Sequence, residues 1–521
     1  MDPAVAAAAP AFARFDNSYA RELGALGVRW PPAAVPAPRL VFVNHALVAE
    51  LGLQLPADAA EAAALLAGNR VPAGAEPLAQ AYAGHQFGGF SPQLGDGRAL
   101  LLGEVVDVAG RRRDLAFKGS GRTPYSRGGD GKAALGPMLR EALIGESLHA
   151  LGVPTTRALA VAATGETVWR EQPLPGAVLT RVAASHLRVG TFEFVAAQGE
   201  RELLRRLLAY TLARHDPELV GAPEAALGLL QAVVRRQAAL VAQWMNLGFI
   251  HGVMNTDNMT ISGEAIDFGP CAMLEAHDPA AVFSSIDRRG RYAYGNQPVA
   301  ARWNLARLAE ALLPLMIDAD AAAAAQRRAV DAASAAVAAF DGHYRAALLR
   351  GQRAKLGLRE AAGDADAADA ADAALAADWF ALLQRHRIDH TLGWLHLAAA
   401  ATGDEAALAA LFVQAGADAA APAAWLQRWH ARCAADDGGA SSPAARAARA
   451  QRLRTVNPRV VARNHCVEQA LQAATQDADL RPFDALLAAL RRPCDMPPPD
   501  SGYDRPAPAE FTAAYCTYCG T

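Results

Sequence analysis

Two charged side chains in the first third of the chain have the types and positions needed to hold a phosphate group. Lys118 ends the short apolar run 114–118, and Glu141 lies on a predicted helix about twenty residues further on. Glu141 shares a stripe of that helix with Met138 and Leu148, at helical spacing. Because a carboxylate on an apolar stripe is costly unless it is paired, the sequence predicts an ion pair between Lys118 and Glu141.

Two glycine-rich turns flank this lysine. Gly95-Asp96-Gly97-Arg98 precedes an apolar strand at 99–106, and the loop at 128–135 runs into a helix that Pro137 is expected to open. Glycines let backbone N–H groups approach a phosphate closely, and Arg98 adds positive charge. A single Gly-x-Gly turn is also typical of a plain hairpin, so this interpretation depends on the other motifs.

The segment 251–270 carries the strongest signal. Asn258 stands in a short loop, and Asp267-Phe268-Gly269 follows a predicted hairpin. In protein kinases an Asn and an Asp-Phe-Gly in this order hold a divalent metal against phosphates, and oxygen ligands suit Mg²⁺. The kinase catalytic Asp lies five residues before that Asn, where this chain has Val253, so Asp257 is the nearest carboxylate. The alternative is a simple Asx-rich turn between strands.

The elements that would position these residues alternate along the chain. Short strands and turns are expected over 80–180, a helical region over 200–247 that ends at Gly248, and helices again from Trp303 onward. Residues 1–75 are expected to form short helices and loops broken by prolines. The pattern predicts an α+β fold.

Composition excludes several classes of protein. The chain has 521 residues, with 50 Lys and Arg against 53 Asp and Glu, which argues against a role in coating nucleic acid or an anionic membrane. Six cysteines are too few for a disulfide scaffold. The sequence contains no long uncharged apolar run of the kind that forms a transmembrane helix. Asp2 stands where the start of a signal peptide would carry positive charge. We therefore expect a cytoplasmic enzyme that binds neither nucleic acid nor membrane.

Five long motifs resemble the selenoprotein O family. They are YAGHQFGGFSPQLGDGRALLLGEV, FKGSGRTPYSRGGDGKAALGPMLRE, LTRVAASHLRVGTFEF, HGVMNTDNMTISGEAIDFGPCAML and GRYAYGNQPVAARWNLARLAEAL. The resemblance is continuous from about residue 80 to 315 and looser at NPRVVARNH and the final CGT. It implies a protein-kinase-like, two-lobed fold with additional N-terminal and C-terminal helical segments. The expected divisions are 1–79, 80–180 (N-lobe), 181–345 (C-lobe) and 346–521.

The resemblance also implies an activity. ATP would bind in the reverse of the kinase orientation, so that AMP passes to Ser, Thr or Tyr hydroxyls of target proteins and pyrophosphate leaves. Asp257 would be the proton acceptor, and Asn258 and Asp267 would bind Mg²⁺, with Mn²⁺ as the other candidate ion. The remaining nucleotide-binding residues would be Gly95, Gly97, Arg98, Lys118, Asp130, Gly131, Arg181 and Arg188, again with Asp267, and Glu141 would support Lys118.

Other reactive side chains have simpler interpretations. His85, His149, His186 and His251 have no partner at metal-ligand spacing and are expected to be packed or hydrogen-bonded. Cys516 and Cys519 have redox spacing, and some members of the family carry selenocysteine near this end, so a redox pair is a further hypothesis. Cys271 is expected to be a packed small residue.

Two other functions remain open from the sequence. One is an ordinary protein or small-molecule kinase, against which Val253 counts. The other is a pseudokinase that binds nucleotide and responds to redox state without catalysis, against which Lys118, Glu141, Asn258 and Asp267 count. All three functions share one fold and differ in which phosphorus, if any, is attacked.

Overall fold

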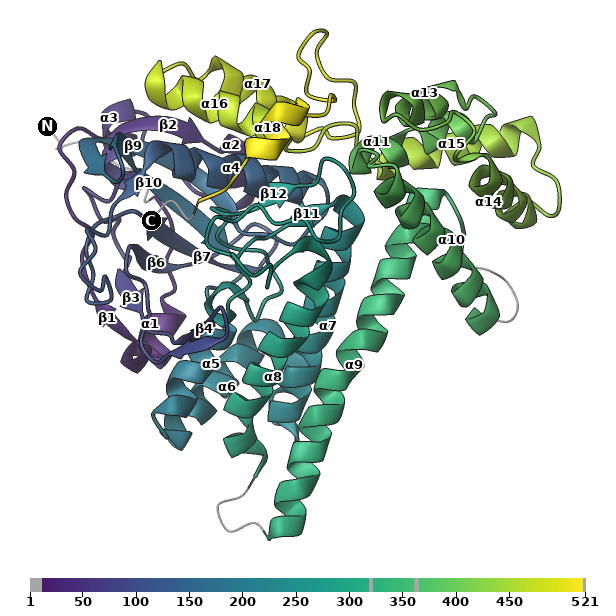
Figure 1. Cartoon of the computed structure of the whole chain (residues 1–521). Coiled ribbons are helices and arrows are strands. Elements are labelled where there is room, and N and C mark those ends of the chain that lie inside the picture. Colours follow the sequence, from purple (N-terminus) through teal and green to yellow (C-terminus); the bar gives the residue numbers. More distant parts are fainter. Residues whose placement is uncertain (1–11, 318–321, 360–364, 519–521) are drawn as a thin grey trace, which may run out of the picture.

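The computed structural model describes residues 12–317, 322–359 and 365–518, and it combines one large sheet with many helices (Figure 1). The mixed composition agrees with the α+β class expected from the sequence. The sheet lies on one side of the molecule and a compact group of helices on the other (Figure 1). The long helix α9 (Ala323–Leu356) leads from the foot of the molecule to that group of helices (Figure 1).

The large sheet is antiparallel and has the strand order β1-β3-β6-β7-β10-β9-β2, with β8 paired to β10. Its strands are β1 (Gly27–Arg29), β2 (Arg39–Val43), β3 (Leu78–Gln80), β6 (Ala99–Val106), β7 (Arg112–Lys118), β8 (Ala133–Ala134), β9 (Arg157–Trp169) and β10 (Pro173–Ala183). Two small antiparallel pairs complete the strands: β4 (Gly84–Gln86) with β5 (Gly89–Ser91), and β11 (Phe249–Ile250) with β12 (Ala272–Met273).

Both faces of the sheet are buried, which explains the apolar runs in its central strands, such as 100–102 in β6 and 115–117 in β7. Successive residues of a strand point to opposite faces. Leu101 accordingly joins the core that includes α4 (Leu135–Ala150), whereas Leu102 joins the core that includes α3 (Ala59–Leu66). The same division separates Leu179 from its neighbour Val178 in β10. Two of the predicted nucleotide-binding residues, Lys118 and Arg181, lie on the central strands β7 and β10.

Helices below the sheet form the rest of the main core (Figure 1). They are α1 (Ser18–Glu22), α5 (Val189–Ala197), α6 (Arg201–His215), α7 (Ala225–Leu247) and α8 (Gln297–Met316). Helix α2 (His45–Glu50) instead places Leu47 in the core that includes α3. The expected stop at Gly248 is confirmed, because this residue caps α7 with a φ of 76°. Within the described residues, α7 alone is long and apolar enough to cross a bilayer, but 61% of its apolar window is buried in the protein.

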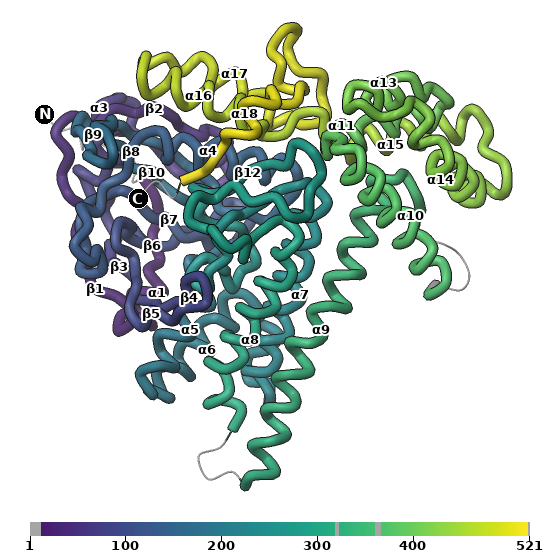
Figure 2. The backbone as a smooth tube through the Cα atoms, in the orientation of Figure 1, coloured from purple at the N-terminus to yellow at the C-terminus, as the bar shows by residue number. Residues whose placement is uncertain are grey.

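The C-terminal helices divide into two groups. The first has its own core around four buried tryptophans and contains α10 (Ala365–Arg385), α11 (His390–Leu395), α12 (Leu397–Ala400), α13 (Ala406–Gln414), α14 (Ala423–Asp436) and α15 (Pro443–Val456). The second, α16 (Asn464–Gln476) and α17 (Arg481–Leu490), returns to pack on α4. Beyond them lies α18 (Ala509–Ala514), and Figure 2 shows the chain passing from it toward the sheet.

The N-terminal region differs from the expected helices and loops. It contributes β1 and β2, which lie at the two ends of the large sheet, as well as α1, α2 and α3. These strands have three and five residues and no clear alternation of apolar and polar side chains, so their sequence alone carries a weak signal. Their partners, β3 and β9, lie far along the chain. Pairing with those strands, rather than local propensity, fixes their conformation.

Candidate functional site

A cavity of about 620 Å³ lies between the sheet and the segment 253–270. Every nucleotide-binding, metal-binding and catalytic residue expected from the sequence lines it. They are Gly95, Gly97, Arg98, Lys118, Asp130, Gly131, Glu141, Arg181, Arg188, Asp257, Asn258 and Asp267. Residues that are up to 172 positions apart in the chain therefore meet in one pocket.

Lys118 is held between two carboxylates. It is the last residue of β7, and its Nζ donates to Glu141 Oε1 at 2.6 Å and to Asp267 Oδ1 at 2.5 Å. Glu141 reaches it from α4, which begins at Leu135, so Pro137 is the third residue of that helix rather than the first. Both Lys118 and Glu141 are buried. Their pairing satisfies the two charges that the apolar surroundings would otherwise penalise.

Asp267 is the meeting point of the positive charges. Its Oδ1 accepts from Lys118 and also from Arg181 Nη1 at 2.8 Å, and no described residue donates a hydrogen bond to Oδ2. Burial opposes ionisation, but the charges of Lys118, Arg181 and Arg188 outweigh it and hold the pKa of Asp267 well below its usual value. Asp267 is one of the few non-glycine residues with a positive φ, 65°. Such backbone strain is characteristic of functional sites.

Arg181 and Arg188 come from β10 and from the start of α5, and both are buried. Arg188 lies with its guanidinium 4.5 Å from the centre of the Tyr82 ring and donates to the His186 carbonyl. Its Nε is buried without a hydrogen-bond partner in the described part of the chain. A buried guanidinium that keeps an unused N–H is well suited to a phosphate oxygen.

The two glycine-rich turns form part of the lining of the pocket. A Cβ at Gly95, whose φ is 88°, would lie 2.5 Å from Tyr125 Cγ, and one at Gly131 would lie 2.1 Å from the carbonyl oxygen of Gly121. Only glycine fits at either position. Asp130 is paired with Arg170 through a contact of 2.8 Å, which lowers the pKa of Asp130. The second turn thus presents an ion pair as well as backbone N–H groups.

Asp257 has a different environment. It lies in a short 3₁₀ helix, Thr256–Asn258, where its Oδ2 accepts from Gln86 Nε2 at 3.3 Å and its Oδ1 is buried without a partner among the described residues. Burial raises the pKa of Asp257 to about 6, an effect that the Gln86 hydrogen bond and the Arg188 charge reduce only in part. A carboxylate in such surroundings can exchange a proton near neutral pH.

Asn258 and Asp267 fit the donor set of Mg²⁺. Asn258 Nδ2 donates to the Val253 carbonyl, which leaves the amide oxygen as the ligand atom, and Asp267 Oδ2 accepts no hydrogen bond from a described residue. One amide and one carboxylate suit an ion that keeps several waters and takes few protein ligands. No group of three His, Cys, Asp or Glu side chains that could hold a metal occurs in the described ranges.

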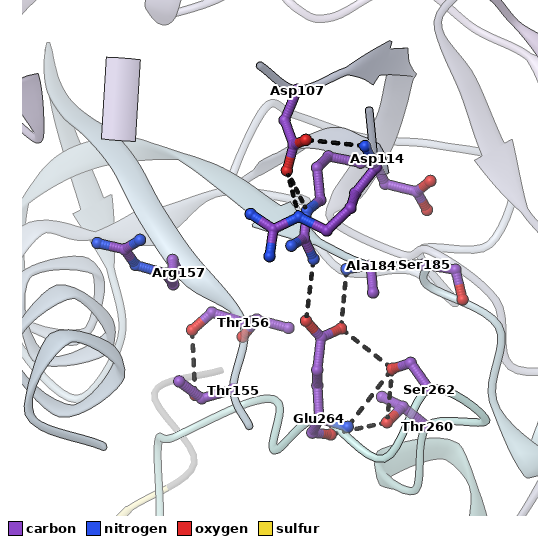
Figure 3. Close-up of polar contacts among 12 residues, drawn as sticks. Asp107, Asp114, Thr155, Thr156, Arg157, Ala184, Ser185, Thr260, Ser262 and Glu264 are labelled. Atoms are coloured by element: carbon purple, nitrogen blue, oxygen red, sulfur yellow. Dashed lines mark hydrogen bonds and ion pairs between the residues drawn. The ribbon is translucent and has the colours of Figure 1, made fainter. Parts of the chain in front are cut away.

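Glu264 connects the loop that carries Asp267 to Ala184, the residue that follows β10 (Figure 3). Glu264 Oε2 accepts from the backbone N–H of Ala184 at 2.8 Å and from Ser262 Oγ at 3.0 Å, and Arg113 approaches Oε1 at 3.9 Å. Burial raises the pKa of Glu264 to about 7, against the effect of these donors. Glu264 therefore connects the strand that bears Arg181 to the loop that bears Asp267.

Three of the four histidines and Cys271 behave as expected, whereas His149 is exposed and its ring has no hydrogen bond to a described residue. His85 is hydrogen-bonded to Glu193, His186 to Asp114, and His251 to the carbonyl of Ile266. Cys271 is buried and donates to the Phe268 carbonyl, and burial raises the pKa of its thiol to about 11.

The structure describes one of the two C-terminal cysteines. Cys516 is half-buried and free, whereas Cys519 lies outside the described residues. Next to Cys516, Thr517 donates to the carbonyl of Pro270 at 2.7 Å and pairs with Ser284. This stretch of the chain therefore lies against the turn that follows Asp267.

Sequence reasoning missed several residues of the pocket. Gln86, Tyr82 and Arg170 line it beside the expected residues, and each touches one of them. Gln86 lies within a family-like motif, which was the only available signal. Its contact with Asp257 joins positions 171 residues apart, a separation that no local pattern reveals.

Comparison with known proteins places these features in context. Residues 13–491 match the family described as protein adenylyltransferase SelO. The chain is 56% identical over 509 residues to a protein of Cereibacter sphaeroides named protein nucleotidyltransferase YdiU, covering 98% of this chain and 99% of that protein. Proteins of the same name from Chromobacterium violaceum and a Mycobacterium species are 54% and 52% identical, covering 94% and 97% of this chain and 98% and 99% of theirs.

Proposed function

The chain belongs to the protein adenylyltransferase SelO family, and from this membership we propose that it transfers AMP from ATP to hydroxyl groups of Ser, Thr or Tyr on target proteins. It is a nucleotidyltransferase enzyme. The reaction draws on ATP, so we place the activity in the cytoplasm. We also propose that the sheet with α4 and the helices around α7 correspond to the two lobes of a kinase-like fold.

The observation that carries the proposal is the convergence of three buried cations in one pocket. Lys118 and Arg181 both contact Asp267, and Arg188 adds a third charge with an unused N–H. A triphosphate brings several negative charges, and only such a concentration of cations would offset the loss of its hydration. The glycine-rich turns at Gly95 and Gly131 would let backbone N–H groups approach the same phosphates.

The proposed chemistry uses Asp257 as the proton acceptor. The hydroxyl of the target protein gives its proton to the Asp257 carboxylate, and the hydroxyl oxygen forms a bond to the α-phosphorus. The bond from that phosphorus to the oxygen bridging to the β-phosphorus breaks, and pyrophosphate leaves with the electron pair. Lys118, Arg181 and Arg188 would stabilise the charge that develops on the phosphates.

Asn258 and Asp267 would hold Mg²⁺ or Mn²⁺. The ion, when bound, would supply further charge neutralisation on the phosphates. Lys118 and Arg181 keep Asp267 ionised, so its carboxylate would be ready for a cation at any pH near neutral.

The main alternative is an ordinary kinase, in which the γ-phosphorus is attacked. Val253 stands at the position where a kinase has its catalytic Asp, and it is buried and lines the pocket. An aliphatic side chain can neither orient nor deprotonate a hydroxyl. This observation favours attack at a different phosphorus, with Asp257 as the acceptor.

The test is labelling with ATP that carries a radioactive phosphate at either the α or the γ position, in the presence of Mg²⁺. We expect label to enter protein from the α position only, and to be lost in Asp267→Ala. The matched control is Asp341→Ala, which removes an exposed carboxylate paired with Arg302 on the helices outside the pocket. Label from the γ position alone would establish a kinase, and binding of ATP without any label would favour a non-catalytic role.

A further inference from the structure

The hairpin formed by β4 and β5 contacts the short helix that carries Asp257 through a series of consecutive residues. Gly84, His85, Gln86 and Phe87 each touch a residue between 255 and 257. The small size of Gly84 permits this approach, since a Cβ there would lie 2.6 Å from Asp257 Oδ1. The hairpin and the helix therefore form one packed unit, although they are about 170 residues apart in the chain.

Gln86 is the only side chain of the described residues that donates a hydrogen bond to the Asp257 carboxylate. Gln86 contacts Oδ2 of Asp257, whereas Oδ1 is buried against the hairpin and has no hydrogen-bond partner among the described residues. Asp257 lines the pocket, so Oδ2 is the oxygen through which it can act there. The orientation of that oxygen depends on one neutral amide.

Two anchors hold the hairpin in place. The backbone N–H of His85 donates to Thr256 Oγ1 at 2.7 Å, and both the His85 ring and the Thr256 hydroxyl bond to the carboxylate of Glu193 on α5. The backbone N–H of Phe87 donates to Asn255 Oδ1 at 3.0 Å. Gln86 lies between these anchors, so its side chain starts from a fixed backbone and is not free to follow Asp257 if the carboxylate turns.

We propose that Gln86 is a positioning residue, which sets the plane of the Asp257 carboxylate so that Oδ2 faces the incoming hydroxyl of the target protein. This inference rests on the proposed function. A carboxylate oxygen has two lone pairs; Gln86 occupies one and leaves the other for the hydroxyl proton. An amide donor fixes the direction of this oxygen without adding a positive charge to the site.

The experiment compares Gln86→Met with the unaltered chain, using α-labelled ATP and Mg²⁺. Met has about the length of Gln and cannot donate a hydrogen bond. We expect kcat for AMP transfer to fall by about 10- to 100-fold, since misplacement of a reacting group has effects of this order. The KM and the dissociation constant for ATP should change less than about twofold, because these depend on the cations. The matched control is Ser91→Ala on β5, which leaves every hydrogen bond of the hairpin to residues 255–257 in place.

A double variant makes the test specific to Asp257. In an Asp257→Ala chain, Gln86→Met should cause no further loss, since there is no carboxylate left to orient. A loss that persists in that background, or a raised KM for ATP with kcat unchanged, would overturn the inference by placing Gln86 on the nucleotide or in the general fold.

The outcomes also separate this inference from the proposed function. Equal AMP transfer by the unaltered chain and Gln86→Met would overturn the role of Gln86 alone. No AMP transfer by the unaltered chain would overturn the proposed function together with the inference that rests on it.

Discussion

The pocket contains two carboxylates that are built in contrasting ways. Asp267 is surrounded by Lys118, Arg181 and Arg188, and its pKa is held far below the usual value. Asp257 has one described side-chain donor, the neutral amide of Gln86, and a pKa that burial raises to about 6. The first is fixed as an anion, whereas the second can gain and lose a proton.

This difference teaches how one pocket can serve two tasks. A group that holds a cation must stay charged, and surrounding cations achieve that at the price of making it useless as a base. A proton acceptor needs the opposite, a low-charge and partly desolvated position. The chain separates the two by placing Asp267 after a turn that Glu264 connects to Ala184, and Asp257 against the β4–β5 hairpin.

The most severe way to break this arrangement is Asp267→Asn. The amide keeps the shape of the side chain but cannot supply negative charge to a cation, so we expect AMP transfer to fall by about 1000-fold or more. Quantitative labelling from α-labelled ATP over a range of Mg²⁺ concentrations measures the effect. An unchanged rate with an unchanged dependence on Mg²⁺ concentration would argue that Asp267 is not a metal ligand.

Asp257→Asn tests the other carboxylate. We expect kcat to fall by about 100- to 1000-fold with ATP affinity almost unchanged, because the residue is expected to act on the hydroxyl rather than on the phosphates. Calorimetric titration with ATP and a steady-state assay of pyrophosphate release provide the two values. If ATP affinity fell as far as kcat, the two carboxylates would not have separate tasks.

Gly84→Ala should disturb Asp257 and spare Asp267. The added methyl would lie 2.6 Å from Asp257 Oδ1, so the carboxylate must move, and we expect a loss of about tenfold in kcat. The control is Gly89→Ala on the partner strand, where the nearest atom is an ordinary 3.6 Å away. Similar activity of both variants would show that the hairpin tolerates displacement of Asp257.

Glu264→Gln should have the smallest effect on AMP transfer, within about twofold, and a clear effect on how stability depends on pH. The native pKa near 7 exceeds the ordinary value of 4.5, so between these values the folded chain holds a proton that the unfolded chain has lost. Stability contributed by this group therefore falls as pH rises from about 4.5 to 7. At about 1.4 kcal/mol per pKa unit, the penalty above pH 7 is on the order of 3 kcal/mol.

Denaturant unfolding at pH 5 and pH 8 measures this difference. Relative to the unaltered chain, Glu264→Gln should gain stability between the two values. Glu202→Gln, at an exposed position on α6, serves as the control. If the stabilities of Glu264→Gln and the unaltered chain changed equally between pH 5 and pH 8, the pKa of Glu264 would not be raised by folding.

The sequence predicted those site residues that are unusual for their own local position in a strand or helix. Lys118 ends an apolar strand and Glu141 lies on an apolar stripe, so each residue signals a partner by its own position. Val253 and Asp257 could be compared with a known spacing. The pairings of Gln86 with Asp257 and of Arg170 with Asp130 could not be predicted, because they depend on the path of the backbone over many residues.

The same reasoning explains which secondary-structure elements could be predicted from the sequence and which could not. The strand at 99–106 and the end of α7 at Gly248 follow from local composition and a helix-stop residue. The edge strands β1 and β2 owe their conformation to partners about 50 and 120 residues later. Local propensity is weak evidence where tertiary pairing decides.

The packing of α4 has a consequence for the order of folding. One side of this helix faces the sheet, and Glu146 is paired there with Arg157 of β9, but Arg140 is paired with Glu468, which is more than 300 residues later. During synthesis the sheet can form first, while Arg140 and the apolar side chains that contact α16 and α17 remain without these partners. Closing so long a loop is slow, and the exposed helix would meanwhile be a natural target for chaperones.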